Sequence, residues 1–442
     1  MKPVKGRGFN GMANVKETPA YLLDEKRRIT PQFVLNANVQ DDGRVVRRMR
    51  RRLIINLPGI HSLWAKTVML GVAPGEEGTP ALYRFEGYKP QEVGNVGGPI
   101  GTPMEYVEVN RKIYLSNGFW SGAYDLRTGV LGAWGMPLPP LPHVTFTAGN
   151  LPPGVYKLCY TYFEEPNRLS GNGPLVEVAW SGGSMGLVLN GKPSNALAWI
   201  TQPNGKELYL ATVNGGVISE PYYTQPLPSF GVQAPPSLRA LCLGHGRLWG
   251  AVEGKLYYSE EFQYEWFRPS GYLPFPEDIV MTVPVNRGLF VNSLETTWFL
   301  AGTNPGKMTV EKMGTGALPG TLTSVLVESI GEGIGYEFTR KLARILMPAW
   351  ATRAGLVVGT YNGELVHLTE GKLRINPRSR GAAFYQNLRG QPLALFSLSG
   401  PVKGAVDPEI SAINSRGRLY IPEPAELVLT GGVTIGGEGE YT

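Results

Sequence analysis

The sequence predicts an all-β protein of propeller type, built from repeated short antiparallel strands. Glycine and proline contribute 58 and 37 of the 442 residues and occur along the whole chain, which implies frequent turns and therefore many short strands. The clearest unit, GRLWGAVEGKLYYS at 246–259, places two short apolar strands between glycine-bearing turns. Apolar and polar residues alternate in such strands with a period of two, as half-buried antiparallel strands require.

The two-strand unit recurs along the chain. Further copies lie at 60–72, 81–87, 106–118, 288–302, 355–371 and 417–432. Their spacing of roughly 40–65 residues fits one four-stranded blade per unit. We therefore predict a β-propeller of about five or six blades, with a generic β-sandwich as the alternative. Aromatic residues of these units form the predicted blade core: Trp64, Tyr114, Trp249, Tyr257, Trp298 and Tyr420.

An inserted domain interrupts the repeat at 138–232. Proline-rich segments, MPLPPLPHVTF at its start and PYYTQPLPSFGVQAPP at its end, enclose about seven short strands. This arrangement predicts an independently folded sandwich of fibronectin or immunoglobulin type. The expected domains are an N-terminal arm and basic strand at 1–55, first blades at 56–137, the insert, and remaining blades with C-terminal strands at 233–442.

The N-terminal arm contains the most basic segment of a chain whose net charge is only +6. Six arginines fall within nine residues: Arg44, Arg47, Arg48, Arg50, Arg51 and Arg52. Guanidinium groups pair well with carboxylates and with phosphates. We expect this run to form an assembly interface with an adaptor or a neighbouring subunit. Contact with DNA and a merely solvated basic strand are the alternatives.

The N-terminal sequence and one internal segment resemble tail-nozzle proteins of short-tailed bacteriophages. The first part of the resemblance rests on these residues: Asn14, Asn36, Asn38, Val39, Gly43, Arg44, Arg47, Arg48, His61, Ser62, Leu63 and Trp64. The second part covers 246–291 and 298–306. Together they span about half of the chain. Arg50–Arg52 depart from the family pattern, because they extend its usual short basic stretch.

The resemblance implies a structural protein of the virion tail that is assembled in the host cytoplasm. In that family six copies form a ring below the portal and adaptor proteins, and DNA leaves through the channel. The expected partners are therefore other copies of the chain, adaptor or portal proteins, tail fibres or tip proteins, and transiently the genomic DNA. A propeller that binds or degrades host-surface polysaccharide is the alternative function.

Catalytic and cofactor motifs are not expected. The four histidines, His61, His143, His245 and His367, have no second histidine or cysteine at metal-ligand spacing. Three carboxylate pairs occur, Glu164-Glu165, Glu260-Glu261 and Glu277-Asp278. Adjacent residues on a strand point to opposite faces, so these pairs do not suit glycoside hydrolysis.

We accordingly predict no enzyme, no metal and no cofactor. The two cysteines, Cys159 and Cys242, have apolar neighbours and are expected to be buried and free. No apolar run is long enough to span a bilayer.

Overall fold

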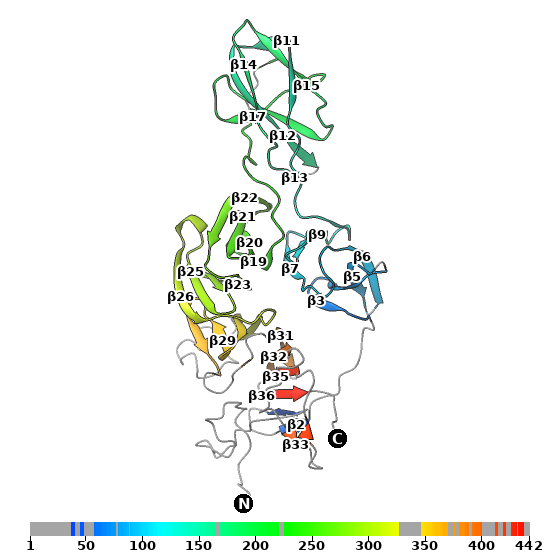
Figure 1. The fold of residues 1–442 in the computed structure, drawn as a ribbon, viewed down its shortest axis with the longest axis vertical. Helices are drawn as coiled ribbons and strands as arrows, with labels where there is room; N and C mark the ends of the chain where they lie inside the picture. Colours follow the sequence, from blue (N-terminus) through cyan, green and yellow to red (C-terminus); the bar gives the residue numbers. More distant parts are fainter. Residues whose placement is uncertain are drawn as a thin grey trace, which may run out of the picture. The chain divides into compact units, whose positions relative to one another are not determined.

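The prediction of an all-β, propeller-like fold is confirmed by a computed structural model of the chain (Figure 1). The structure describes residues 37–39, 45–47, 57–76, 78–87, 89–164, 168–220, 225–326, 346–369, 375, 380–388, 391–399, 412–413, 419–420, 426–430 and 432–436. In these residues antiparallel strands dominate, and the helical structure is one 3-10 turn, η1, at Pro305–Lys307. The chain divides into two compact units, 55–275 and 276–442, the latter together with 1–54.

The 55–275 unit contains three four-stranded sheets in which each strand pairs with its neighbour in sequence. The first sheet comprises β3 (His61–Ala65), β4 (Met69–Pro74), β5 (Pro80–Glu86) and β6 (Lys89–Asn95). The second comprises β7 (Glu105–Val109), β8 (Lys112–Ser116), β9 (Ser121–Asp125) and β10 (Leu131–Ala133). The third comprises β19 (Arg239–Gly244), β20 (Arg247–Val252), β21 (Lys255–Glu260) and β22 (Gln263–Pro274).

The 276–442 unit contains three more four-stranded sheets. One comprises β23 (Met281–Val285), β24 (Gly288–Asn292), β25 (Thr296–Ala301) and β26 (Thr309–Thr315). The next comprises β27 (Thr323–Leu326), β28 (Leu346–Thr352), β29 (Gly355–Gly359) and β30 (Leu365–His367). The last comprises β31 (Gly381–Leu388), β32 (Gln391–Ser399), β35 (Glu426–Thr430) and β36 (Gly432–Gly436). Two short hairpins accompany them, β1 (Ala37–Val39) with β2 (Val45–Arg47), and β33 (Ala412–Ile413) with β34 (Leu419–Tyr420). The number of blades stays a prediction.

Tight turns connect neighbouring strands of these sheets. His245 and Gly246 join β19 to β20 with φ angles of 53° and 71°, and Asn110 and Arg111 join β7 to β8 with 51° and 61°. Two successive residues with positive φ are the signature of the hairpin turn whose twist matches the flanking strands. Gly246 is suited to its position because it has no Cβ to strain this conformation.

Apolar layers between neighbouring sheets form the core of each unit. The layer between the first and second sheets includes Leu70, Leu82, Ile113 and Leu115, all fully buried. The layer between the second and third includes Val107, Tyr114, Leu248 and Phe267. A single sheet could not bury both of its faces, so the stacking of sheets supplies most of the stabilisation, at ~25 cal/mol per Å² of apolar surface removed from water.

The residues predicted to form the blade core occupy different depths. Trp249 is fully buried, and Tyr114 and Trp298 are buried as well. Trp64 and Tyr257 are only partly buried, although both pack against the apolar layers of their unit. Tyr420 belongs to β34, and its side chain lies outside the described residues.

A β-sandwich lies between the second and third sheets in sequence. One of its sheets has the order β11 (His143–Leu151), β15 (Met185–Asn190) and β18 (Val217–Ile218). The other has the order β14 (Val176–Trp180), β12 (Gly154–Glu164), β16 (Ala196–Thr201) and β17 (Leu208–Leu210), and β13 (Arg168–Leu169) also pairs with β12. In an immunoglobulin-type sandwich, strands B and E are neighbours in one sheet and strands C′, C, F and G form the other. Here β11 and β15 occupy the places of B and E, and the order β14-β12-β16-β17 corresponds to C′-C-F-G, while β18 adds an edge strand beside β15.

Two apolar clusters stabilise the sandwich. The cluster between its sheets includes Tyr156, Leu158 and Leu187. On the outer face of β12 and β16, Cys159 and Trp199 form a second cluster, which Leu227 of the returning chain covers. Cys159 and Cys242 are both buried and free. Burial raises the pKa of the Cys159 thiol to about 12, so it stays protonated at neutral pH.

The layer between the second and third sheets gives a direct test of this packing. Leu248→Ala should lower the free energy of unfolding by about 3 kcal/mol, because it leaves a cavity among fully packed side chains. Val130→Ala is the control, because Val130 is largely exposed and its truncation should cost less than about 0.5 kcal/mol. Urea unfolding followed by tryptophan fluorescence measures both. Equal losses in the two variants would contradict the assignment of this core.

Candidate assembly site between the sandwich and two sheets

An irregularity in β22 creates the candidate site. Glu260 pairs with Gln263 and Ser259 pairs with Phe267, so three residues of β22 between these pairs have no direct partner on β21. These residues are Tyr264, Glu265 and Trp266. Bulges of this kind interrupt the ladder and re-aim side chains. As a result, three consecutive residues of the third sheet contact the second sheet and the sandwich.

The Glu265 carboxylate is the centre of the site. Its Oε1 lies 2.7 Å from Lys112 Nζ of β8, and its Oε2 lies 2.7 Å from Arg168 Nε of β13. The Tyr114 hydroxyl donates to Oε1 at 3.4 Å. The Glu265 side chain is only 14% exposed, so it needs both cations to compensate for lost hydration. One carboxylate therefore connects the third sheet, the second sheet and the sandwich.

Burial and charge act on the groups around Glu265. The pKa of Tyr114 is raised, first by burial and then by the negative charge of Glu265. Burial alone would lower the pKa of Arg168, but hydrogen bonds to Glu265 and Glu164 outweigh it and raise that pKa. The bond to Glu164 spans 2.8 Å and lies in a more exposed place. Arg168 is therefore charged and held from two sides.

Two indole groups flank the ion pairs. Trp134 Nε1, just after β10, donates to the carbonyl oxygen of Tyr264 at 2.9 Å. Trp266 Nε1 donates to the carbonyl oxygen of Leu169 in the sandwich at 2.8 Å. The Trp134 ring also packs against Tyr114 and Phe267, with ring centroids 5.1 and 6.0 Å apart. These directional contacts fix the orientation of the parts that the ion pairs connect.

The chain approaches itself very closely at the neck of the sandwich, the segments 138–141, 170–175 and 229–232. A Cβ at Gly171 would lie 1.7 Å from the carbonyl oxygen of Val232, and one at Gly173 would lie 2.5 Å from that of Pro139. The side-chain oxygen of Asn172 accepts a hydrogen bond from Gly231 N at 2.7 Å. Glycine is required at both positions by this close approach. The neck is thus packed and hydrogen-bonded.

A second carboxylate connects the second and third sheets directly. Glu105 Oε2 of β7 accepts a hydrogen bond from Leu241 N of β19 at 2.5 Å. Removal from water raises the pKa of Glu105, against the opposing effects of the Leu241 and Ala240 amides and the Arg239 charge. This group therefore holds a proton more tightly in the folded protein than in the unfolded chain.

The residues singled out in the sequence are distributed differently. Arg47 lies in β2, with its side chain outside the described residues, and the other five arginines of the run lie wholly outside them. The described members of the three candidate carboxylate pairs have partners of other kinds. Glu164 and Glu260 pair with arginines, and Glu277 accepts hydrogen bonds from Ser293 and Thr296. Glu165 lies outside the described residues.

The sequence analysis missed Glu265, Lys112 and Arg168. The one visible signal was an acidic residue within the aromatic string Tyr264–Phe267. Nothing in the spacing shows which cations, 97 and 153 residues away, would meet it.

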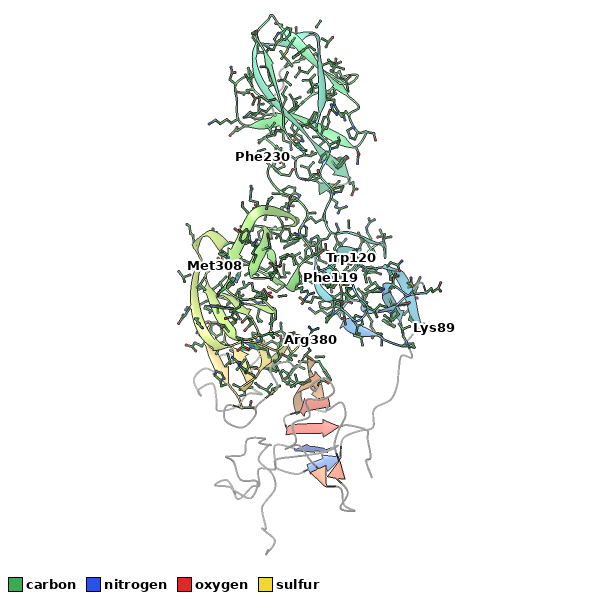
Figure 2. The ribbon with its side chains drawn as sticks, viewed as in Figure 1. Lys89, Phe119, Trp120, Phe230, Met308 and Arg380 are labelled. Carbon is green, nitrogen blue, oxygen red and sulfur yellow. The ribbon has the colours of Figure 1, made fainter. Side chains whose placement is uncertain are left out.

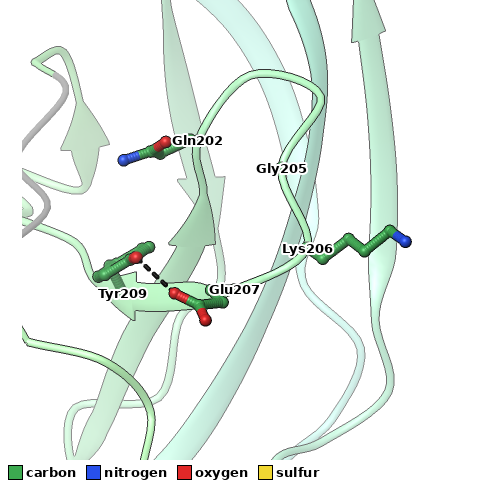
Figure 3. A pocket seen from close by; sticks show the side chains of 5 residues that line it. All are labelled: Gln202, Gly205, Lys206, Glu207 and Tyr209. Atoms are coloured by element: carbon green, nitrogen blue, oxygen red, sulfur yellow. Dashed lines mark hydrogen bonds between the residues drawn. The ribbon is translucent and has the colours of Figure 1, made fainter.

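A shallow hollow lies on the sandwich surface at the connection from β16 to β17. It has a volume of about 230 Å³ and is lined by Gln202, Gly205, Lys206, Glu207 and Tyr209 (Figure 3). Tyr209 OH donates to Glu207 Oε2 at 2.7 Å, and this bond raises the pKa of Tyr209. The volume is below the usual 300–1,000 Å³ of ligand pockets. Among the described residues, no group of histidine, cysteine and acidic side chains could hold a metal ion. The described part also has no helix long and apolar enough to cross a membrane.

Comparisons with known proteins give only remote similarities. No protein-family model matches the chain, and no curated protein matches it. An uncharacterized protein of Listeria monocytogenes EGD-e, lmo1340, is similar over 79% of this chain and 94% of its own, at 10% identity and a TM-score of 0.23. A puromycin hydrolase is similar over 78% of this chain and 59% of its own, at 12% identity and a TM-score of 0.19. A puromycin-hydrolyzing peptidase of Mycobacterium tuberculosis is similar over 76% and 58%, at 9% identity and a TM-score of 0.23.

These matches correct one expectation. The sequence analysis predicted that the chain is not an enzyme, whereas two of the similar structures are hydrolases by name. The prediction is therefore withdrawn. At these identities and TM-scores the similarity carries no argument for hydrolase chemistry in this chain either.

Neutralising Glu265 tests the candidate site. Glu265→Gln should lower the free energy of unfolding by about 2 kcal/mol, because it removes the charged partner of Lys112 in a mostly buried place and leaves Arg168 with only the more exposed Glu164. The matched control is Glu164→Gln, which removes a more exposed partner of Arg168 and should cost less than about 1 kcal/mol. Thermal unfolding and limited proteolysis at 136–142 and 228–235 measure the effect. A Glu265→Gln protein as stable and protease-resistant as the control would disprove a central role for this carboxylate.

The raised pKa of Glu105 predicts a specific pH dependence. Because the folded state binds this proton more tightly, stability from this group is complete below the ordinary pKa of glutamate and declines as pH rises through the raised value. Glu105→Gln keeps an oxygen acceptor for Leu241 N and has no charge to desolvate. Urea unfolding between about pH 4 and pH 8 should therefore show the variant gaining stability relative to the parent protein as pH increases. A relative loss at higher pH would contradict the assigned direction.

Proposed function

We propose that the chain is a structural subunit of a bacteriophage tail, of the tail-nozzle type, and that it assembles into a ring. The sequence resemblance motivates this proposal, and it extends to hexameric assembly, adaptor or portal partners, and a channel for DNA. The proposal concerns assembly and makes no statement about catalytic activity. It fits an architecture in which sheets stacked through apolar layers form a stiff body.

The observation that carries the proposal is the double attachment of the sandwich to two sheets. A freely linked domain would need only a flexible connection, whereas Glu265, Trp266 and Asn172 add an ion-pair centre and two hydrogen bonds at the neck. Linked domains are expected to move relative to one another unless contacts between them prevent it, and we propose that these contacts do so here. A rigid projection is useful in a particle that must hold fibres or neighbouring proteins in fixed positions.

Exposed apolar loops of the second sheet are the proposed contact with a neighbouring subunit. Ile100, in the loop before β7, is 58% exposed, and Phe119, at the tip of the β8–β9 hairpin, is 57% exposed. The two loops are in contact, because a Cβ at Gly98 would lie 3.1 Å from Phe119 Cβ. Trp120 lies beside Phe119 (Figure 2), and the Arg239 guanidinium lies 5.4 Å from the Phe119 ring centre. Clustered exposed apolar side chains commonly mark protein interfaces.

The purified full-length chain should form ring-shaped particles with rotational symmetry in negative-stain microscopy. The double variant Ile100→Ser with Phe119→Ser should remain monomeric at the same concentration, since it removes the apolar contact while leaving the core intact. Val130→Ser is the control at an equally exposed apolar position and should assemble normally.

Immunolabelling of virions decides whether the assembly belongs to a tail. Label at the tail of the particle is the expected result. A monodisperse monomer that is absent from virions would refute the proposal, and cleavage or binding of host polysaccharide by that monomer would favour the alternative function.

A further inference from the structure

The first strand of the sandwich has a free edge. β11 pairs with β15 on one side, from His143↔Asn190 to Thr147↔Gly186. Among the described residues no other strand pairs with it, and near its end Asn150 N donates to Ser219 O at 2.7 Å, so the free part of the edge is His143–Thr147. Residues 145–148 are all exposed, and their side chains alternate between the two faces of the strand. β11 is therefore an edge strand that its own sandwich covers only in part.

The register shows which backbone groups the edge presents. Leu189 N donates to Gly216 O, so the backbone groups of Leu189 face β18. Because these groups alternate between the two sides of an antiparallel strand, those of Val188 face β11 and bond to its partner Thr145. The N–H and C=O groups of Val144 and Phe146 consequently face away from β15. Two donors and two acceptors lie along this edge at the spacing of an extended chain.

An exposed aromatic pair lies beside these groups. Phe146 is 48% exposed, and its ring centre lies 4.8 Å from that of Trp180 at the end of β14. The other side of the Trp180 indole is occupied by Gly182, and its Nε1 donates to Gly183 O at 2.6 Å. The Trp180 ring is thus held in place, and the Phe146 ring is the part that an added strand could cover.

β11 lacks the charges and prolines that other edge strands of this chain carry, and its one irregularity lies beyond Thr147, outside the segment considered for pairing. Lys89, Pro90 and Glu92 occur in β6, and Glu311 and Lys312 occur in β26. Charges and prolines on an edge oppose pairing with another chain, as does a very short edge strand such as β18. β11 has nine residues and contains no Asp, Glu, Lys, Arg or Pro. Its sequence favours pairing.

We propose that the β11 edge accepts an extended segment of a partner protein as an additional β-strand. The exposed backbone groups require an extended chain, and the strand's lack of charge favours an uncharged segment. The Phe146 and Trp180 rings favour an aliphatic side chain at the position that faces them. Strand addition of this kind draws its affinity from main-chain hydrogen bonds and its specificity from alternate side chains.

The partner segment belongs to another protein rather than to a second copy of β11. Two β11 edges would pair around a two-fold axis, and a ring with only rotational symmetry has no such axis between its neighbours. This step rests on the proposed function. The strand-accepting edge itself does not depend on it.

A peptide with the sequence of Met185–Asn190 is the probe, because it is an uncharged strand sequence with aliphatic Leu187 and Leu189 at alternate positions. We expect the fluorescein-labelled peptide to bind the full-length protein and to slow amide hydrogen exchange at Val144 and Phe146. The same peptide with proline in place of Leu187 should bind at least tenfold more weakly, because proline cannot donate a main-chain hydrogen bond. Phe146→Lys should also weaken binding at least tenfold, because it removes the apolar contact and places a charge on the edge.

Thr147→Lys is the matched control, because it adds the same charge at a residue whose backbone groups face β15. Its binding should change less than threefold, and both variants should melt close to the parent protein. Two results would overturn the proposal: no peptide binding at about 1 mM, or a dimer of the parent protein that Phe146→Lys abolishes, since the occupant would then be a second copy. Failure to form rings together with retained peptide binding would instead refute only the proposed function.

Discussion

The compensation of one nearly buried carboxylate organises the 55–275 unit. Glu265 has lost most of its hydration, and a carboxylate in such a place is tolerated only when cations and hydrogen-bond donors replace the lost water. Lys112 and Arg168 provide that replacement from two different parts of the fold. The Glu265 carboxylate is therefore fully compensated only when the third sheet contacts both the second sheet and the sandwich. The indole hydrogen bonds of Trp134 and Trp266 add direction to the same contact.

The sequence predicts the regular part of this structure well. Period-two alternation and glycine-bearing turns identify strands such as β20 and β21, since burial of one face imposes that alternation. The irregular part could not be predicted. A departure from pairing in β22 depends on tertiary contacts, and it is this departure that directs Glu265 and Trp266 outward. The place of β18 beside β15 could not be predicted either, because strand length and polarity do not specify which edges meet.

The position of the insertion connects the fold to the proposed function. The sandwich occupies the connection from β10 to β19, and both of its ends pass through the glycine-rich neck. The proposed function requires that this domain, held at two ends and at an ion-pair centre, does not bend at a hinge. The exposed strand β11 then gives the sandwich an edge to which, as proposed above, a partner strand can bind. Stiff attachment and an edge able to bind a partner together suit a component that joins other proteins in a large particle.

Pulsed electron–electron double resonance, which measures the distance between two spin labels, tests most directly whether the sandwich is rigidly attached to the sheets. Spin labels at Lys89→Cys in the first sheet and Lys206→Cys in the sandwich report the distance between the two parts, and the native cysteines are buried. Rigid attachment predicts a narrow distance distribution that broadens when Glu265→Gln is added. A broad distribution in the otherwise unaltered protein, unchanged by Glu265→Gln, would contradict the account.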